Sequence, residues 1–210
     1  MLRAILGGSF DPVHLGHVAM ARHVLEHELA EGLLVVPAWR SPHKYSNTAT
    51  PADRLAMVRL VFDGWDSVVV DDREIRRGSV SFTVDTLEEL VAEYPDDRFR
   101  LVIGADNLAG FSGWRSPGRI QELAEVIVYP RDGRSTALAA IERVGLDPRR
   151  LIPVTDFDHP VSSTTVRAML ARGILPDDQL PRSVAAYITA RGLYTGCLLY
   201  TSPSPRDQRP

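Results

Sequence analysis

Short runs of valine, isoleucine and leucine alternate with helix-like segments along nearly the whole chain. We predict strands at residues 4–6, 33–36, 67–71, 99–103, 126–129 and 151–154. We predict helices at residues 18–29, 51–62, 84–94, 117–124, 136–144, 163–172 and 181–191. Apolar strands that are each followed by a helix are typical of a parallel sheet with helices on both faces. The alternation therefore predicts an α/β fold of the Rossmann-like kind.

Three of these helices carry start signals. Thr50-Pro51 and Ser116-Pro117 each place a hydroxyl residue before a proline, and Ser162 or Ser163 precedes a helical pattern. A side-chain oxygen before the first turn accepts from a free backbone N–H, and proline is favoured at the first helical position. We therefore expect these hydroxyls to act as N-caps.

Bulk properties favour one self-contained domain. A chain of 210 residues is long enough for a sizeable α/β core. The net charge of −3 gives no basic field, so we expect local phosphate recognition and no nucleic-acid partner. Cys197 is the only cysteine, which excludes a disulfide framework and a thiolate metal cluster. No leader-like start and no apolar run near 20 residues is present, so we expect a cytoplasmic protein without a membrane partner.

The composition changes near the C-terminus. From Cys197 onward there is no apolar period, and Pro203 and Pro205 stand too close together for a helix. We expect a single domain over residues 1–194. We interpret residues 195–210 as a disordered segment foreign to that domain, with an ordinary flexible tail as the alternative.

The stretch 7–17, GGSFDPVHLGH, joins the first predicted strand to the first predicted helix. Such a junction offers free backbone N–H groups and the positive end of a helix dipole, which favour phosphate. Its glycines allow close approach of a ligand, and its two histidines share one helix face. Each residue alone fits an ordinary turn, but the whole string indicates a nucleotide's phosphates. His43, Lys44 and Asp106 follow other strands, so one site at the carboxyl ends of the strands could hold them all.

This stretch resembles the GG[ST]FDPxHxGH signature of bacterial nicotinate-mononucleotide adenylyltransferases, in the HxGH nucleotidyltransferase superfamily. Residues 38–44 (AWRSPHK) are similar to the family's PHK loop, and residues 81–87 (SFTVDTL) to its [SY]xTxxTL block. Residues 103–107 (IGADN) with Trp114 are similar to its IGAD…W block, and residues 161–167 (VSSTTVR) to its ISSTxxR block. The resemblance covers nearly all of residues 1–194.

The resemblance implies a nucleotidyltransferase fold and an enzyme of NAD biosynthesis. It implies that ATP and nicotinate mononucleotide react to give nicotinate adenine dinucleotide and pyrophosphate, with Mg²⁺ accompanying ATP. The attacking phosphate oxygen is already ionised, so alignment and charge neutralisation matter more than a strong base. We expect the two substrates as partners and leave a homo-oligomer open.

By the same resemblance, His14 and His17 hold the α-phosphate, while Lys44 and Arg167 steady the leaving phosphates. These four are the expected catalytic residues. The expected ATP-binding residues are Gly8, Ser9, Phe10, His14, Gly16, His17, Gly104, Asp106, Ser162, Ser163, Thr164 and Arg167. Asp106 would bind ribose hydroxyls or order the shell of the metal, and we assign no side chain as a direct metal ligand.

The second substrate is expected at a different group of residues. The expected nicotinate mononucleotide residues are Ser9, Phe10, His43, Lys44, Thr83, Thr86, Trp114 and Arg115. Trp114 would stack on the pyridine ring, with a core anchor as the alternative, and backbone N–H groups near residues 83–86 would take the carboxylate. Arg115 stands where the family often has tyrosine. Our hypothesis is that it attracts the carboxylate and so favours the acid over the amide.

Two basic pairs are assigned no role. His23 and His27, four residues apart, could form a metal pair, but no further ligand is close in the sequence, so we expect a solvated helix face. We interpret Arg76-Arg77 as a charge pair in a loop rather than a phosphate patch.

Several alternatives share HxGH chemistry. They are a pantetheine-phosphate adenylyltransferase, a cytidylyltransferase and an enzyme that prefers nicotinamide mononucleotide. The PHK loop, residues 81–87 and Trp114 argue against the first two. An aminoacyl-tRNA synthetase core is disfavoured because no KMSK-like loop is present. A non-catalytic nucleotide-binding module would have lost His14, His17 or Arg167, and all three are present.

Overall fold

A computed structural model describes residues 1–42, 48–130 and 146–195. Six parallel strands form one sheet in the order β3-β2-β1-β4-β5-β6. The strands are β1 (Leu2–Gly8), β2 (Gly32–Pro37), β3 (Val68–Val70), β4 (Arg98–Gly104), β5 (Ala124–Tyr129) and β6 (Leu151–Pro153). All six predicted strands are confirmed within a few residues, and so is the α/β fold class. The helix predicted at 136–144, the residues His43 and Lys44, and the tail from 196 lie outside the described residues.

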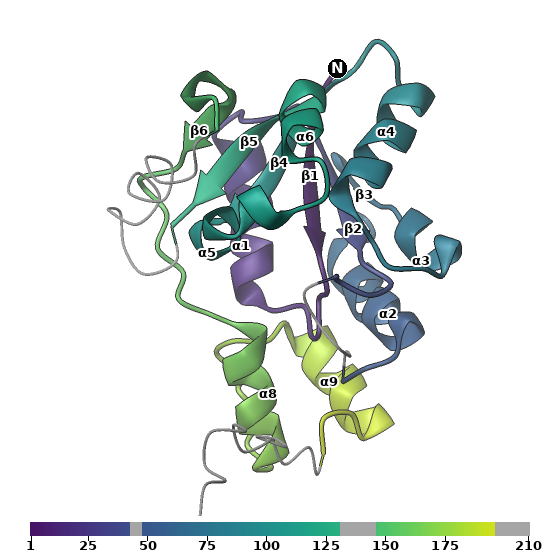
Figure 1. Ribbon diagram of the computed structural model, residues 1–210. Coiled ribbons are helices and arrows are strands. Elements are labelled where there is room, and N and C mark those ends of the chain that lie inside the picture. The colour runs from purple at the N-terminus through teal and green to yellow at the C-terminus, as the bar shows by residue number, and fades with distance from the viewer. Residues whose placement is uncertain (43–47, 131–145, 196–210) are drawn as a thin grey trace, which may run out of the picture.

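Helices cover both faces of the sheet (Figure 1). The α-helices are α1 (Leu15–Glu26), α2 (Pro51–Phe62), α3 (Arg73–Arg77), α4 (Thr83–Glu93), α5 (Ala105–Ala109), α6 (Pro117–Leu123), α8 (Ser163–Ala171) and α9 (Arg182–Arg191). Short 3₁₀ turns are η1 (Phe111–Gly113) and η2 (Pro148–Arg150). Among the described residues, none of these helices has both the length and the apolar character needed to cross a bilayer.

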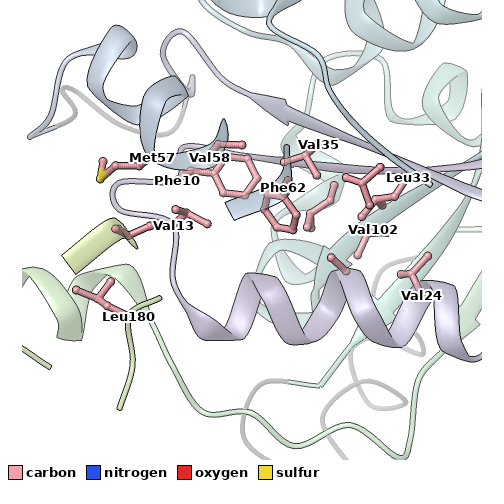
Figure 2. Packing of buried hydrophobic residues seen from close by; sticks show 14 of the residues in the cluster. Phe10, Val13, Val24, Leu33, Val35, Met57, Val58, Phe62, Val102 and Leu180 are labelled. Carbon is pink, nitrogen blue, oxygen red and sulfur yellow. The ribbon is translucent and has the colours of Figure 1, made fainter. Parts of the chain in front are cut away.

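Alternate residues of the strands feed two separate cores. Ala4 and Leu6 of β1 pack with residues of α1, α2, α8 and α9, whereas Ile5 packs with residues of α4, α5 and α6. This alternation follows from the period of two along a strand and explains why the strands are apolar throughout. Figure 2 shows Phe10 and Val13, from the loop after β1, among Met57, Val58 and Leu180. The first core therefore reaches up to the loop that carries the predicted phosphate motif.

The strand order reverses beside β1. The chain runs from β1 to β2 and β3 on one side, then returns to place β4, β5 and β6 on the other. Open parallel sheets bind ligands outside the carboxyl ends of their strands at such a reversal. In Figure 1, α8 and α9 lie beyond the carboxyl end of β1. The fold thus directs the β1–α1 loop, the start of α5 and the start of α8 toward one place.

Two of the predicted caps are confirmed. The hydroxyl of Thr50 accepts from the Asp53 N–H at 3.1 Å, and that of Ser162 from the Thr165 N–H at 3.1 Å. The third is wrong, because Ser116 makes no side-chain cap bond. Its φ of 53° is left-handed, whereas capping side chains stand on extended backbone.

Two charge predictions are also corrected. Arg76 and Arg77 lie on the short helix α3 and not in a loop; Arg76 pairs with Asp72 at 2.6 Å and Arg77 with Glu89 at 2.8 Å. A five-residue helix is too short to show a hydrophobic period. His23 does not lie on a solvated face either: it is buried against the segment that follows β6.

Helices α2 and α9 are joined by a buried carboxylate. Asp53 Oδ1 accepts from the Tyr187 hydroxyl at 2.9 Å and from Arg191 Nη2 at 3.1 Å, and Oδ2 accepts from the Thr50 hydroxyl at 2.6 Å. The Thr50 hydroxyl, followed by Tyr187 and Arg191, holds the pKa of this carboxyl below its ordinary value. The ionised form of Asp53 is therefore the one that stabilises the fold.

We expect Asp53→Asn to lower the free energy of unfolding at pH 7 by about 1–2 kcal/mol, because it removes a charge from three hydrogen bonds. Since the folded-state pKa lies below the unfolded one, this contribution is complete above about pH 4 and is lost as the pH falls through the folded pKa. Urea denaturation of both proteins at pH 7 and at lower pH measures it. The matched control is Asp63→Asn, an exposed acid at the other end of α2, which should change little. A loss that is the same at every pH would contradict the role of the charge.

Candidate active site

A cavity of about 610 Å³ opens at the carboxyl ends of β1 and β4, where the strand order reverses. The predicted ATP residues that line it are Gly8, Ser9, Phe10, His14, Gly16, His17, Gly104, Asp106, Ser163 and Thr164. The predicted nicotinate mononucleotide residues that line it are Ser9, Phe10, Thr83, Thr86, Trp114 and Arg115. The fold therefore brings most of the predicted residues to one cavity.

The two histidines of the motif lie against each other at the start of α1. Their ring centroids are 3.8 Å apart, and His14 is the N-cap residue. The backbone N–H of His14 donates to Nδ1 of His17 at 3.3 Å. Since that nitrogen accepts, a neutral His17 carries its proton on Nε2. The backbone thus makes His17 a hydrogen-bond donor beside a helix N-terminus, which suits an anion.

Gly16 leaves room for one of these rings. A Cβ at this position would lie 3.0 Å from Cε1 and Nδ1 of His14 and 3.5 Å from the Val161 carbonyl. The imidazole of His14 therefore packs directly on the glycine backbone, and a side chain at position 16 would push the ring slightly away. This contact gives a physical reason for glycine between the two histidines.

The strand ends are open on the cavity side. A Cβ on Gly7 would meet nothing within 4 Å, so the backbone there faces open space. A Cβ on Gly104 would lie 2.5 Å from Asp106 Oδ1, so the carboxylate folds back over the end of β4. Asp106 stands in the first turn of α5 and is exposed. An oxygen ligand thus lies at the cavity beside bare backbone.

Helix α8 closes on the motif loop through hydrogen bonds. Arg167 Nη1 donates to the Asp11 carbonyl at 2.6 Å, and Nη2 reaches the Thr164 hydroxyl at 3.4 Å. The Ser163 hydroxyl donates to the Pro12 carbonyl at 3.0 Å. Neither Arg167 nor Ser162 is among the described residues that line the cavity. Arg167 thus holds the loop in place and lies next to the cavity.

The far side of the cavity is formed by the start of α4 and by η1. Trp114 lines it and stacks on the buried Phe111, with centroids 4.9 Å apart at 28°. Arg115 pairs with Asp85 at 3.1 Å, and its guanidinium lies 4.9 Å from the Phe82 ring centroid. An aromatic ring and a cation therefore lie next to a helix N-terminus, where an aromatic carboxylate would fit.

Comparison with known proteins agrees with this geometry. The model of the cytidylyltransferase-like family matches residues 5–169. The chain belongs to that family. It is a nucleotidyltransferase.

Relatives within the family narrow the relationship. The chain is 37% identical over 197 residues to a probable nicotinate-nucleotide adenylyltransferase of Gloeobacter violaceus, covering 90% of this chain and 94% of that one. It is 37% identical over 196 residues to a protein of the same description from Rhodopirellula baltica, covering 90% and 92%. A Plasmodium falciparum nicotinic acid mononucleotide adenylyltransferase complexed with NaAD shares the fold, with a TM-score of 0.73, 18% identity and coverage of 92% and 97%. The resemblance inferred from the sequence motifs is confirmed.

The sequence motifs missed a buried arginine that supports this nucleotidyltransferase site. Arg54 of α2 is fully buried and donates to the carbonyls of Ser9 at 2.6 Å, Ala38 at 2.7 Å and Trp39 at 2.7 Å. It therefore joins the loops that follow β1 and β2. The sequence shows Arg54 only as a charged residue inside an apolar helical pattern. A charged side chain in such a pattern ordinarily lies on the surface, so its burial was not predicted.

A buried glutamate was missed as well. Glu74 of α3 lines the cavity and accepts from the Thr86 hydroxyl at 2.6 Å. Burial raises the pKa of the Glu74 carboxyl. The N–H of Thr86 donates to the Phe82 carbonyl at 3.3 Å, so both polar groups of Thr86 bond within the protein. In the sequence, Glu74 lies among charged residues that indicate an exposed segment.

We expect Gly16→Ala to lower kcat about three- to tenfold while the fold is retained, because the new Cβ shifts the His14 ring slightly from its position against the backbone, and a shift of about 1 Å can cost about 10²-fold. Steady-state kinetics and thermal melting measure the two effects separately. Gly118→Ala is the matched control, since Gly118 is also helical and a Cβ there meets nothing within 4 Å. Normal turnover in Gly16→Ala would contradict the steric role of this glycine.

Proposed function

We propose that this enzyme transfers AMP from ATP to nicotinate mononucleotide, forming nicotinate adenine dinucleotide and pyrophosphate in NAD biosynthesis. The observation that carries the proposal is the pair His14 and His17 at a helix start, in the same cavity as Trp114 and Arg115. Relatives with 37% identity over nine-tenths of the chain are described as probable nicotinate-nucleotide adenylyltransferases, which supports the same substrate pair.

The chemistry requires little proton transfer. The phosphate of the mononucleotide attacks the α-phosphorus of ATP, the bond to the β,γ-phosphates breaks, and pyrophosphate leaves with its electron pair. Charge grows on oxygens around the α-phosphorus. The Nε2 proton of His17, the imidazole of His14 and the N-terminus of α1 would stabilise that charge. The two loops held by Arg54 would keep these donors aligned.

The leaving pyrophosphate needs cations. Arg167 uses two of its donors on Asp11 and Thr164, and its remaining N–H groups could reach phosphate oxygens. Lys44, which lies outside the described residues, is proposed for the same role, and His43 for the mononucleotide. Ser162, Ser163 and Thr164 place a second helix N-terminus beside the phosphates.

A Mg²⁺ ion fits the donors present. The carboxylate of Asp106 stands at the cavity, and Mg²⁺ is commonly bound by one or two carboxylates together with substrate phosphates. Bound Mg²⁺ would neutralise the β,γ-phosphates of ATP. Asp106 itself would orient the water ligands of the ion or the ribose hydroxyls of ATP.

We also place the reaction in the cytoplasm and leave the oligomeric state open.

The nicotinate end would bind on the opposite side. The pyridine ring would stack on Trp114, which also stacks on the Phe111 ring. Its carboxylate would lie between Arg115 and the first N–H groups of α4, near Thr83. An amide in the same place would gain less from both the cation and the helix dipole.

A substrate panel tests the function. The protein is incubated with Mg²⁺, ATP or CTP, and nicotinate mononucleotide, nicotinamide mononucleotide or phosphopantetheine, and dinucleotide and pyrophosphate are measured. We expect the product from ATP and nicotinate mononucleotide to exceed all others. His17→Ala should lower kcat by about 10²–10³ with an unchanged melting temperature, since one charge-stabilising donor is lost. Faster reaction with another acceptor, or near-normal turnover of His17→Ala, would overturn the proposal.

Selectivity is tested at Arg115. We expect Arg115→Ala to lower the ratio of kcat/KM for the acid over the amide about three- to tenfold, because an exposed charge contributes modestly. Arg119→Ala is the matched control. Arg119 lies on helix α6, is also exposed, and pairs with Glu88 of α4 and Glu122 of α6. If both variants keep the wild-type ratio, Arg115 does not determine selectivity.

A further inference from the structure

Two histidines and an aspartate converge beside helix α1, beyond the phosphate motif. His23 Nε2 lies 3.3 Å from Asp156 Oδ1, and His27 Nε2 lies 3.4 Å from Asp156 Oδ2. One ligand atom from each of the three lies within 4.8 Å of the others. Asp156 follows β6 in the segment that runs toward α8 (Figure 1). Residues about 130 positions apart in the sequence therefore meet here.

Hydrogen bonds orient both imidazole rings. The Tyr129 hydroxyl lies 2.9 Å from His23 Nδ1 and 3.5 Å from the Met20 carbonyl. Nδ1–H of His27 donates to the His23 carbonyl at 3.2 Å, so a neutral His27 has its lone pair on Nε2. The Nε2 atoms of both rings face the carboxylate of Asp156.

The two rings are stacked 3.9 Å apart at 14°, so their Nε2 atoms reach the carboxylate of Asp156 side by side. Neutral imidazole and ionised carboxylate are the forms that bind metals, and one cation among these three groups would interact with all of them.

We propose that His23, His27 and Asp156 bind a divalent transition-metal ion, with Zn²⁺ as the fitting probe. Bonds of about 2.0–2.1 Å in a tetrahedral site place neighbouring ligand atoms about 3.4 Å apart. The nitrogen–oxygen distances, 3.3 Å to Oδ1 and 3.4 Å to Oδ2 of Asp156, are close to this spacing, so small side-chain movements would bring one oxygen and both nitrogens around one ion. Two imidazoles and one carboxylate suit Zn²⁺ better than Mg²⁺, which prefers oxygen ligands. A water would complete the set, since His27 and Asp156 are exposed.

The surroundings of the three ligands match those of metal sites. Metal-binding histidines ordinarily donate the second ring N–H to an oxygen, which orients the ring. Here the His23 carbonyl accepts from Nδ1–H of His27, and the Tyr129 hydroxyl, 2.9 Å from His23 Nδ1, would accept the second proton when a metal binds Nε2 of His23. The rings of Phe157 and His23 meet edge to face, with centroids 5.5 Å apart. Phe157 and Tyr129 also line the nucleotide cavity, so a metal bond at Asp156 would tie that wall to α1.

Metal binding is measured on protein freed of metal with a chelator, in the absence of nucleotide. We expect one equivalent of Zn²⁺ by calorimetry, a higher melting temperature with Zn²⁺, and a d–d absorption band with Co²⁺. His27→Ala and Asp156→Asn should each weaken that equivalent at least tenfold and remove the shift in melting temperature. Both residues are exposed, so folding should persist. Asp158→Asn, the same charge change two residues away, is the matched control and should bind like the wild type.

A second variant tests the orienting hydroxyl. Tyr129→Phe keeps all three ligands and should weaken Zn²⁺ binding about 10–100-fold, the usual effect of losing a partner behind a ligand. The site is overturned if His27→Ala and Asp156→Asn bind Zn²⁺ with the affinity and stoichiometry of the wild type. If Zn²⁺ binds instead at His14 and His17, both variants will still bind the same number of Zn²⁺ ions as the wild type. That outcome would also contradict the proposal.

Discussion

The site depends on one buried cation. The guanidinium of Arg54 takes the carbonyls of Ser9, Ala38 and Trp39, and so holds the loops after β1 and β2 at a fixed separation. Burial lowers the pKa of Arg54, and the nearby Asp11 carboxylate acts in the opposite direction. Since a buried charge is tolerated only when it is well bonded, these carbonyls must stay in place for the fold to hold it. The geometry of the phosphate loop is thereby linked to the stability of the core.

Asp11 extends this linkage to the C-terminal part of the chain. Its carboxylate accepts from the N–H groups of Thr48 and Ala49 and from the Tyr194 hydroxyl, and its carbonyl accepts from Arg167. One residue of the motif is thus bonded to three segments that are far apart in the sequence. A loop held from so many sides loses little entropy when a nucleotide binds, which favours an aligned reaction.

The sequence predicted what depends on local pattern. The six strands followed from apolar runs, and the cavity residues of the first motif followed from glycines and histidines at a strand–helix junction. The roles of Arg54 and Glu74 were not predictable, because a charged residue in a helix shows its burial only when its distant partners are known. The same holds for His23. Its partner Asp156 lies 133 positions further along the chain, so the sequence indicated only that His23 and His27 share a solvated helix face. Ser116 failed as a cap because its left-handed backbone is a property of the turn and not of the dipeptide.

Helix α1 shows how one residue type serves opposite charges. At its start, a backbone N–H donates to Nδ1 of His17, which leaves a proton on Nε2 for an anion. About 15 Å further along the axis, Nδ1–H of His27 donates to the His23 carbonyl, which leaves a lone pair on Nε2 of the neutral ring for a cation. What contacts the inner nitrogen therefore decides what the outer nitrogen can bind. The HxGH spacing determines the first arrangement, because the N-cap amide lies three residues before the ring it contacts. The second is completed by Asp156, in the segment after β6, so it exists only in the folded chain.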